Sequence, residues 1–331
     1  MKFKKCAALL LVSSCFLTGC TTSSAKKVDS KYVVASLEKG NKTKNIFADN
    51  LYKDIIDNSS NNSTVFNAVL QNLVDQKFPI NDDMKEDAAT IIKQIKSAYK
   101  SNYGDNYKDS LNQALTSAGY KNLSEYRQRM IKQIQYANFL LDYIDDHFDD
   151  VFNDYYQQCA PKYVSLIKIS VSDTSSPTDD ETSKLNEVKE LISNTDKSFG
   201  DIAQDYSDDS TSSKKGSLGI VDSKDTSGIA NSYGKDVFNA IEALSEGQVS
   251  DVITGDDGYY FVKVTSTDKK TLKKELKKTD IDSPLLAYDD YLQYVVYNSY
   301  KINYKDKDIK KIVQEVVNKA LEERKTKRGE A

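Results

Sequence analysis

Apolar residues in the first half of the chain recur three and four positions apart, which is the spacing of amphipathic helices. From residue 44 to residue 119 this pattern predicts a run of helices, preceded by a short strand over residues 32–37 and a turn at Gly40. Asn81 before two aspartates is a typical N-cap for the longest helix, and Gly119 is a typical C-cap for the last one. We therefore expect an all-helical segment at this end of the chain.

The same spacing continues over residues 124–159. This helix is expected to break near Asp149 and to end before Pro161, because proline cannot continue a helix. The apolar pattern therefore predicts helical structure up to the middle of the chain.

A different pattern begins at Lys162, where short β-rich runs alternate with short helical runs. The predicted order is strand 163–169, loop 172–180, helices 185–192 and 199–206, loop 207–219, helix 237–244, and strands 249–253 and 259–264. Residues 162–266 have the length of one small domain. The sequence therefore predicts a separate domain here that mixes helices and strands.

Helical spacing returns in the lysine-rich residues 268–278 and again in residues 285–325. The last helix carries an apolar stripe formed by Ile309, Ile312, Val313, Val316, Val317 and Ala320. An isolated helix cannot bury such a stripe, so we expect it to return to the N-terminal helices. The alternative is a solvent-exposed basic tail.

The predicted fold class is therefore α+β, with a small α/β domain inserted into a discontinuous all-α domain. The helical domain would consist of residues 31–161 and 267–325, and the insert of residues 162–266. Residues 326–331 would form a tail.

The first twenty residues have the pattern of an export signal. Three lysines precede the apolar residues 6–17, a run too short to span a bilayer, and Leu17-Thr18-Gly19-Cys20 follows. This ending resembles the lipobox of bacterial lipoproteins. The resemblance implies a signal peptide over residues 1–19 and a lipid on Cys20. Residues 20–30 would be the lipidated cysteine and its tether. The alternative is an ordinary secretory signal with a chance cysteine.

Charge and composition exclude several classes of site and partner. The chain has 46 basic and 50 acidic residues, and removal of a leader with three lysines makes it more acidic still, which argues against nucleic acid as a partner. With Cys20 lipidated and two other cysteines in the leader, Cys159 is left alone and no internal disulfide is expected. His147 is the only histidine, so we expect no metal site and no cofactor.

Four motifs follow one another within residues 162–266. The first, Phe199 to Asp209, looks like F-x-x-L-A-x-x-Y-S-x-D, and the second, Lys215 to Gly219, resembles G-G-D-L-G. The third, Ala240 to Ile253, resembles A-x-x-x-L-x-x-G-E-V-S-x-P-V. The fourth, Gly258 to Val264, resembles G-Y-H-I-I-K-V. This order resembles the parvulins. Together with the lipobox and the flanking helices, the chain resembles the PrsA foldase lipoproteins of Gram-positive bacteria, relatives of the SurA-type chaperones.

The parvulin resemblance implies peptidyl-prolyl cis–trans isomerisation by a site with two histidines, an aspartate or cysteine, and apolar groups. The two histidine positions fall on Leu166 and Tyr260, and the aspartate position falls on Asp209. The candidate catalytic residues are therefore Asp209 and Tyr260. The candidate substrate-binding residues are Leu166, Leu218, Tyr233, Val237 and Phe238.

Each polar candidate also has a structural interpretation. Asp209 could cap its own loop backbone, and Tyr260 could pack on the sheet. His147 lies outside this domain among acidic residues and is expected to be a solvated side chain.

The resemblance implies a foldase that is lipid-anchored on the outer face of the cell membrane and binds unfolded or partly folded exported polypeptides. We expect its isomerase activity to be weak or lost, since both histidines are absent. The alternatives are a purely non-catalytic holdase and a solute-binding lipoprotein, which should have two α/β lobes. A repetitive wall protein is disfavoured by the lack of repeats. A monomer and a homodimer both stay open.

Overall fold

The computed structural model describes residues 27–39, 42–276 and 281–330. The leader, Cys20 and the turn at Gly40 lie outside the described residues. The described chain divides into two compact units, one formed by residues 80–290 and the other by residues 27–79 together with 291–330. Both helices and antiparallel sheets are present, so the predicted α+β class is confirmed.

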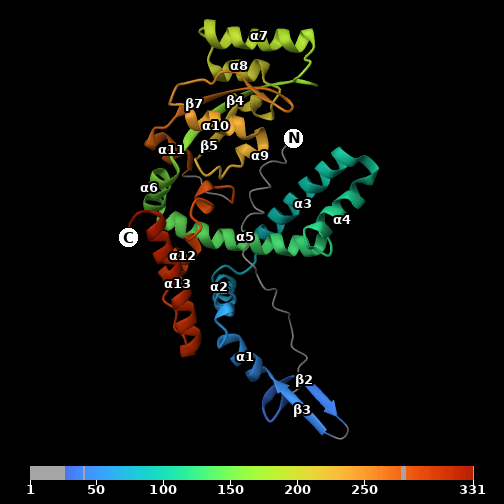
Figure 1. Cartoon of the computed structure of the whole chain (residues 1–331), viewed down its shortest axis with the longest axis vertical. Helices are drawn as coiled ribbons and strands as arrows, with labels where there is room; N and C mark the ends of the chain where they lie inside the picture. The colour runs from blue at the N-terminus through green and yellow to red at the C-terminus, as the bar shows by residue number, and fades with distance from the viewer. Residues whose placement is uncertain (1–26, 40–41, 277–280, 331) are drawn as a thin grey trace. The chain divides into compact units, whose positions relative to one another are not determined.

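The unit formed by the two ends of the chain starts with a small antiparallel sheet and continues with helices. Its elements are β1 (Lys27–Val28), β2 (Lys31–Lys39), β3 (Lys42–Phe47), α1 (Ala48–Ile56), the 3-10 turn η3 (Ser59–Asn61), α2 (Asn62–Lys77), α12 (Leu292–Ser299) and α13 (Lys307–Lys327) (Figure 1). The prediction of helix from residue 44 was wrong, since β3 pairs with β2 up to Phe47. The spacing of Phe47 and Leu51 fits a helix, but the hydrogen bonds of the hairpin determine residues 44–47.

The second half of this unit packs on α2. Phe66 of α2 is fully buried, and its ring lies 4.9 Å from Tyr294 and 5.1 Å from Tyr297, both on α12. The stripe on α13 is buried at Ile312, Val313, Val317 and Ala320, and α13 contacts α2. Residues 285–325 were predicted as helical, and they contain the two separate helices α12 and α13. Asp306 caps the start of α13 by accepting the amides of Asp308 and Ile309.

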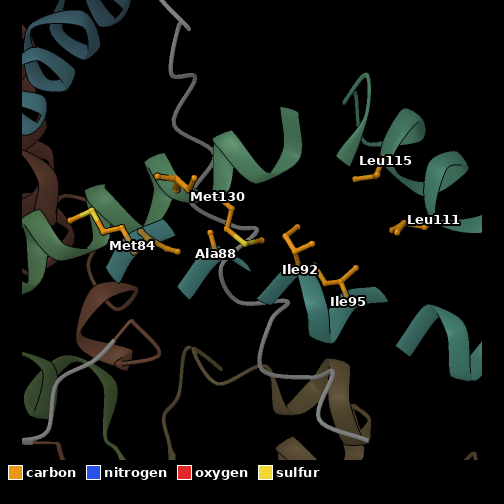
Figure 2. Packing of buried hydrophobic residues seen from close by; sticks show 9 residues of the cluster. Met84, Ala88, Ile92, Ile95, Leu111, Leu115 and Met130 are labelled. Atoms are coloured by element: carbon orange, nitrogen blue, oxygen red, sulfur yellow. The ribbon is translucent and has the colours of Figure 1, made fainter. Parts of the chain in front are cut away.

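The unit of residues 80–290 opens with five helical segments. These are α3 (Asp82–Tyr103), the 3-10 turn η4 (Gly104–Asn106), α4 (Tyr107–Ser117), α5 (Leu123–Asp146) and α6 (Phe148–Cys159). The predicted cap is confirmed, because Asn81 Oδ1 accepts a hydrogen bond from the Met84 amide at 2.9 Å. The break between α5 and α6 falls at His147, two residues before the predicted place. Figure 2 shows the packed core of this segment, with side chains from α3, α4 and α5.

The rest of this unit is a four-stranded antiparallel sheet in the order β5-β4-β7-β6, flanked by helices. Its elements are β4 (Lys162–Ser170), α7 (Asp179–Asn194), α8 (Phe199–Tyr206), the 3-10 turn η5 (Ser210–Lys214), β5 (Ser217–Val221), α9 (Ile229–Tyr233), α10 (Lys235–Ala243), β6 (Ile253–Gly255), β7 (Gly258–Ser266), α11 (Lys269–Leu276) and the 3-10 turn η6 (Pro284–Leu286) (Figure 1).

Two sequence predictions for this sheet need correction. Residues 217–219 were predicted as loop but belong to β5, which pairs with β4 once Gly216 has ended the preceding turn. Residues 249–253 were predicted as a strand, yet only Ile253 belongs to β6. Val249 forms one isolated bridge, and the Ser250 hydroxyl accepts the Val262 amide in place of a regular ladder.

Alternate residues of β4 and β7 point to opposite faces of the sheet. Ile167 and Phe261 belong to the apolar cluster that α7 and α8 cover. Leu166 and Tyr260 belong to the cluster that α9 and α10 cover. The second face therefore carries the two positions at which the parvulin resemblance expects histidine.

Helix α6 is tied to the loop after β5 by buried polar contacts. The Tyr155 hydroxyl donates to Asp222 Oδ2 at 2.9 Å, and Asp222 is fully buried. Burial and the Asp222 carboxylate raise the pKa of Tyr155. The Lys224 ammonium donates to the Tyr288 carbonyl at 2.6 Å. These contacts join three distant parts of the chain beside the sheet.

No helix within the described ranges combines the length and the apolar character needed to cross a bilayer.

Candidate functional site

The structure brings the predicted apolar residues together in one cluster on the α9–α10 face of the sheet. Leu166 on β4 is fully buried, and Tyr260 on β7 is 2% exposed. The cluster also contains the four other predicted residues, Leu218, Tyr233, Val237 and Phe238. Residues far apart in the sequence thus form one apolar core cluster under α9 and α10.

The short helix α9 brings Tyr233 to this cluster. Asp225 caps its start, with Oδ1 accepting the Ile229 amide at 2.5 Å and Oδ2 accepting the Ala230 amide at 3.0 Å. Gly234, with φ of 99°, ends α9 and leads directly into α10. The two helices therefore place Tyr233 on one side of this glycine and Val237 on the other.

Asp209 lies at the edge of the cluster, where it caps its own loop and also contacts Tyr233. Its Oδ1 accepts the Thr211 amide at 2.8 Å and so caps η5. The same oxygen accepts a long hydrogen bond, 3.4 Å, from the Tyr233 hydroxyl. Burial and the charge of Asp209 raise the pKa of Tyr233. Asp209 is thus a loop cap that also faces the candidate site.

Tyr260 is held by groups that the resemblance does not name. Its hydroxyl donates to Asp257 Oδ1, and the Lys168 ammonium donates to Asp257 Oδ2 at 2.5 Å. The same ammonium lies 5.6 Å from the centre of the Tyr260 ring. Burial, and after it the hydrogen bond to Asp257, raises the pKa of Tyr260. The hydroxyl therefore stays protonated at neutral pH.

The Tyr260 ring is also fixed by its packing. The Tyr233 ring meets it edge to face, with centroids 6.2 Å apart. A Cβ atom on Gly255 would lie 2.6 Å from the Tyr260 ring, so only glycine fits at that position. The ring is therefore held between α9 and the β6–β7 hairpin.

Lys168 and Asp257 are the site residues that sequence reasoning missed. Lys168 lies two positions after Leu166 on a predicted strand, so it could have been placed on the same face. Asp257 could not, because its position depends on the hairpin between β6 and β7. His147 takes no part in this cluster; its ring stacks on Tyr143, and its Nδ1 lies 2.9 Å from the Tyr143 carbonyl.

The arrangement offers an apolar surface and few free polar atoms. The hydroxyls of Tyr233 and Tyr260 both donate to carboxylates within the domain. In the described ranges no group of three or more histidine, cysteine, aspartate or glutamate side chains is placed to hold a metal ion. Only the half-buried side chains at the margin of the cluster, Leu218, Tyr233 and Phe238, leave apolar surface for contact with other apolar groups.

Comparison with known proteins identifies the sheet and its helices. Residues 166–266 match the rotamase family model, described as the PPIC-type PPIASE domain. These residues are therefore similar to a PPIC-type domain. The match begins at Leu166 on β4 and ends with the last residue of β7, and so covers every candidate residue except the lipidation site.

Curated relatives support the same resemblance. The foldase protein PrsA of Staphylococcus aureus strain MRSA252 is 33% identical over 155 residues, which are 45% of this chain and 45% of the relative. The PrsA of strain Newman is 32% identical over the same length. The match thus spans about half the length of these relatives.

Solved structures of two further PrsA proteins are also similar. The PrsA structure from Bacillus subtilis is 21% identical, covers 85% of this chain and 98% of its own, and has a TM-score of 0.39. The structure from Streptococcus pneumoniae is 19% identical, covers 85% of this chain and 99% of its own, and has the same TM-score of 0.39. The rotamase match and the curated PrsA relatives confirm the resemblance of the chain to the PrsA foldases.

Proposed function

We propose that this protein is a foldase of exported polypeptides, held by a lipid on Cys20 at the outer face of the cell membrane of a Gram-positive bacterium. Its PPIC-type domain binds extended or partly folded chains and has weak or no isomerase activity. The similarity to PrsA foldases supports the client class, and the lipobox at residues 17–20 supports the anchor.

The observation that carries the proposal is the identity of the two side chains at the centre of the apolar cluster. Leu166 has no polar side-chain atom, and the hydroxyl of Tyr260 is already bound to Asp257. Rotation about a peptide bond has a barrier of about 18–20 kcal/mol. Catalysis requires oriented groups that stabilise the twisted amide, and loss of such groups commonly costs orders of magnitude in rate.

Binding of a chain makes smaller demands on the domain than catalysis does. Leu218, Tyr233 and Phe238 are only half-buried, so part of their apolar surface remains accessible beside the buried centre. Contact with such a surface needs area rather than one exact geometry. A domain with this surface can hold a client after its catalytic groups are lost.

The test is to restore the histidines in the mature chain. The variant Leu166→His with Tyr260→His should isomerise a proline peptide at least roughly tenfold faster than the parent, whose rate should lie close to the uncatalysed one. Leu166→Ala with Tyr260→Phe is the matched control that adds no imidazole. Thermal melts show whether each variant is folded. A parent rate typical of an active parvulin would refute the loss of activity.

The foldase role and the anchor have tests of their own. The mature chain should suppress aggregation of an unfolded exported protein, and the histidine-restored variant should suppress it equally well. Cys20→Ala should release the protein from the membrane fraction or leave it unprocessed. A chain that protects no client contradicts the foldase role, and a processed, retained Cys20→Ala variant contradicts the anchor.

The solute-binding alternative receives no support from the described residues. It requires two lobes in which strands alternate with helices and form parallel sheets. The two sheets in the described chain have three and four strands, and both are antiparallel.

A further inference from the structure

Exposed apolar side chains are concentrated at the start of the described chain. Among the described residues, seven of the eight large apolar side chains with the greatest exposure lie between residues 28 and 55, and the eighth is Tyr103 on α3. The seven are Val28, Tyr32, Val34, Ile46, Leu51, Tyr52 and Ile55. Isolated exposed apolar residues are normal, but a concentration of them indicates a contact surface.

The hairpin of β2 and β3 presents three of these side chains on one face. Val33 pairs with Phe47 and both are half-buried, whereas Ile46, which pairs with Ala35, is 43% exposed. The register shifts at Val34, which is 44% exposed, and Tyr32 is 46% exposed. We call Tyr32, Val34 and Ile46 the hairpin patch.

Positive charge surrounds the hairpin patch. Residues 27–47 contain five lysines and two acidic residues, in a chain whose net charge is −4. The Lys27 ammonium lies 4.5 Å from the centre of the Tyr32 ring. Lys44 is exposed and lies two positions before Ile46 on the same strand, hence on the same face. Exposed apolar and aromatic side chains among lysines are typical of surfaces that bind anionic lipid headgroups.

The hairpin also begins close to the lipidated residue. Seven peptide units separate Cys20 from Lys27, and even a fully extended chain of that length reaches only about 25 Å. The surface potential of an anionic membrane acts within a Debye length of roughly 8–10 Å. If Cys20 is anchored by its acyl chains, this short tether keeps the start of the hairpin close to the lipid headgroups.

We propose that the hairpin patch docks on the anionic headgroups of the membrane in which the lipid of Cys20 is inserted. This proposal rests on the lipid anchor of the proposed function. Tyr32, Val34 and Ile46 enter the headgroup layer, and Lys27 and Lys44 neutralise lipid phosphates. The acyl chains and the hairpin then act as two linked attachments, of which the second gains from the high local concentration that the first creates.

The test uses residues 20–331 with Cys20→Ser, the mature chain without acyl chains. It should bind vesicles with about one third phosphatidylglycerol at least roughly tenfold more tightly than pure phosphatidylcholine vesicles, and added salt should weaken the binding. Tyr32→Ser with Val34→Ser and Ile46→Ser should weaken it roughly tenfold, as should Lys27→Glu with Lys44→Glu. Tyr103→Ser and the pair Lys307→Glu with Lys310→Glu are the matched controls, and neither should change it by more than about twofold.

Fluorescence gives a second measurement that does not depend on stability. The chain has no tryptophan, so Tyr32→Trp introduces a single emitter within the hairpin patch. Its emission should shift to the blue with anionic vesicles and stay unchanged with neutral ones. Tyr103→Trp should show no shift with either.

The proposal is overturned if the parent does not bind anionic vesicles, if the controls weaken binding as much as the patch variants, or if the emission of the Tyr32→Trp variant does not move. It is also overturned if the patch variants lose client protection while vesicle binding is intact, since the surface would then bind polypeptide. Membrane retention of the acylated parent, with loss of retention in Cys20→Ala, tests the anchor separately. Failure of the docking therefore leaves the proposed function standing.

Discussion

The two faces of the PPIC-type sheet are built from alternate residues of the same strands, yet their buried cores differ in one chemical respect. On the α7–α8 face the fully packed side chains are aliphatic or phenylalanine, with Phe261 at the centre. On the α9–α10 face the neighbouring residue Tyr260 brings a hydroxyl into the core. That hydroxyl needs a partner, which Asp257 provides.

The difference indicates that the two faces contribute differently to the stability and to the candidate site of this domain. The core of the α7–α8 face contributes stability through apolar burial. The α9–α10 face adds a hydrogen-bonded hydroxyl to its apolar burial and borders half-buried aromatic side chains. Fold and site are thus separate properties of the same strands, and variants on the two faces should separate them experimentally.

The largest expected effect comes from Phe261→Ala. Phe261 is 3% exposed, and truncation of a buried phenylalanine lowers the free energy of unfolding by about 3–5 kcal/mol. Phe238→Ala is the matched variant on the other face. Because Phe238 is half-buried, its loss should cost less stability but weaken client protection. Urea unfolding and an aggregation assay measure the two effects. Equal stability losses with unchanged protection would remove the distinction between the faces.

The next effect is expected at Gly216, which lies between the backbone of β4 and helix α8. Its φ is +76°, and a Cβ there would lie 2.5 Å from the Leu166 carbonyl oxygen and 2.8 Å from the Ala203 Cβ. Gly216→Ala should therefore lower the free energy of unfolding by about 2–4 kcal/mol. Gly219 has φ of +81° but open space around it, so Gly219→Ala should cost only about 1–2 kcal/mol. If both variants unfold at the same urea concentration, the close contact at Gly216 is unimportant.

A smaller effect should mark the α9–α10 face at high pH. Tyr260→Phe should lower the free energy of unfolding at neutral pH by about 0.5–1.5 kcal/mol, the net value of one hydrogen bond. The pKa of Tyr260 is raised above its ordinary value of 10.0. Its contribution is therefore complete below pH 10.0 and decreases as the pH rises beyond that value. Unfolding curves of parent and variant should approach each other in alkaline solution; a constant gap would contradict the raised pKa.

The smallest effect should mark the α7–α8 face at low pH. Glu181 at the start of α7 accepts the backbone amides of Thr178 and Ser172, which lower its pKa from 4.5 to about 2. Its stabilisation is complete above pH 4.5 and is lost as the pH falls towards 2. Glu181→Gln should therefore melt slightly earlier than the parent at neutral pH and together with it near pH 2. A difference in melting temperature that persists to the acid end would show that the charge of Glu181 is not the cause.

Much of this domain could be predicted because its elements carry strong local signals. The β-rich run around Leu166 identified β4, and in the helical segment before this domain Asn81 before two aspartates identified a helix start. Helix α9 was missed because five residues are too few to show a helical period. The strand β3 was missed because its pairing with β2, and not its own sequence, determines its conformation.

The candidate site shows the same limit. Motif order was enough to select Leu166, Tyr260 and Asp209, which the fold places around one apolar cluster or at its edge. The contact of Lys168 with Asp257 depends on the register between β4 and β7 and on the hairpin that follows β6. Register arises from tertiary pairing, so sequence spacing alone could not supply this partner for Tyr260.

The aromatic cluster around Phe66 is built from residues that are synthesised at different times. Phe66 is synthesised well before the rings that cover it, Tyr294 and Tyr297. All the residues of the PPIC-type sheet are synthesised before these two tyrosines. The sheet can therefore form before α12 is available to pack on α2. A chain that stops short of residue 291 lacks both rings, so the Phe66 side chain loses the aromatic groups that cover it.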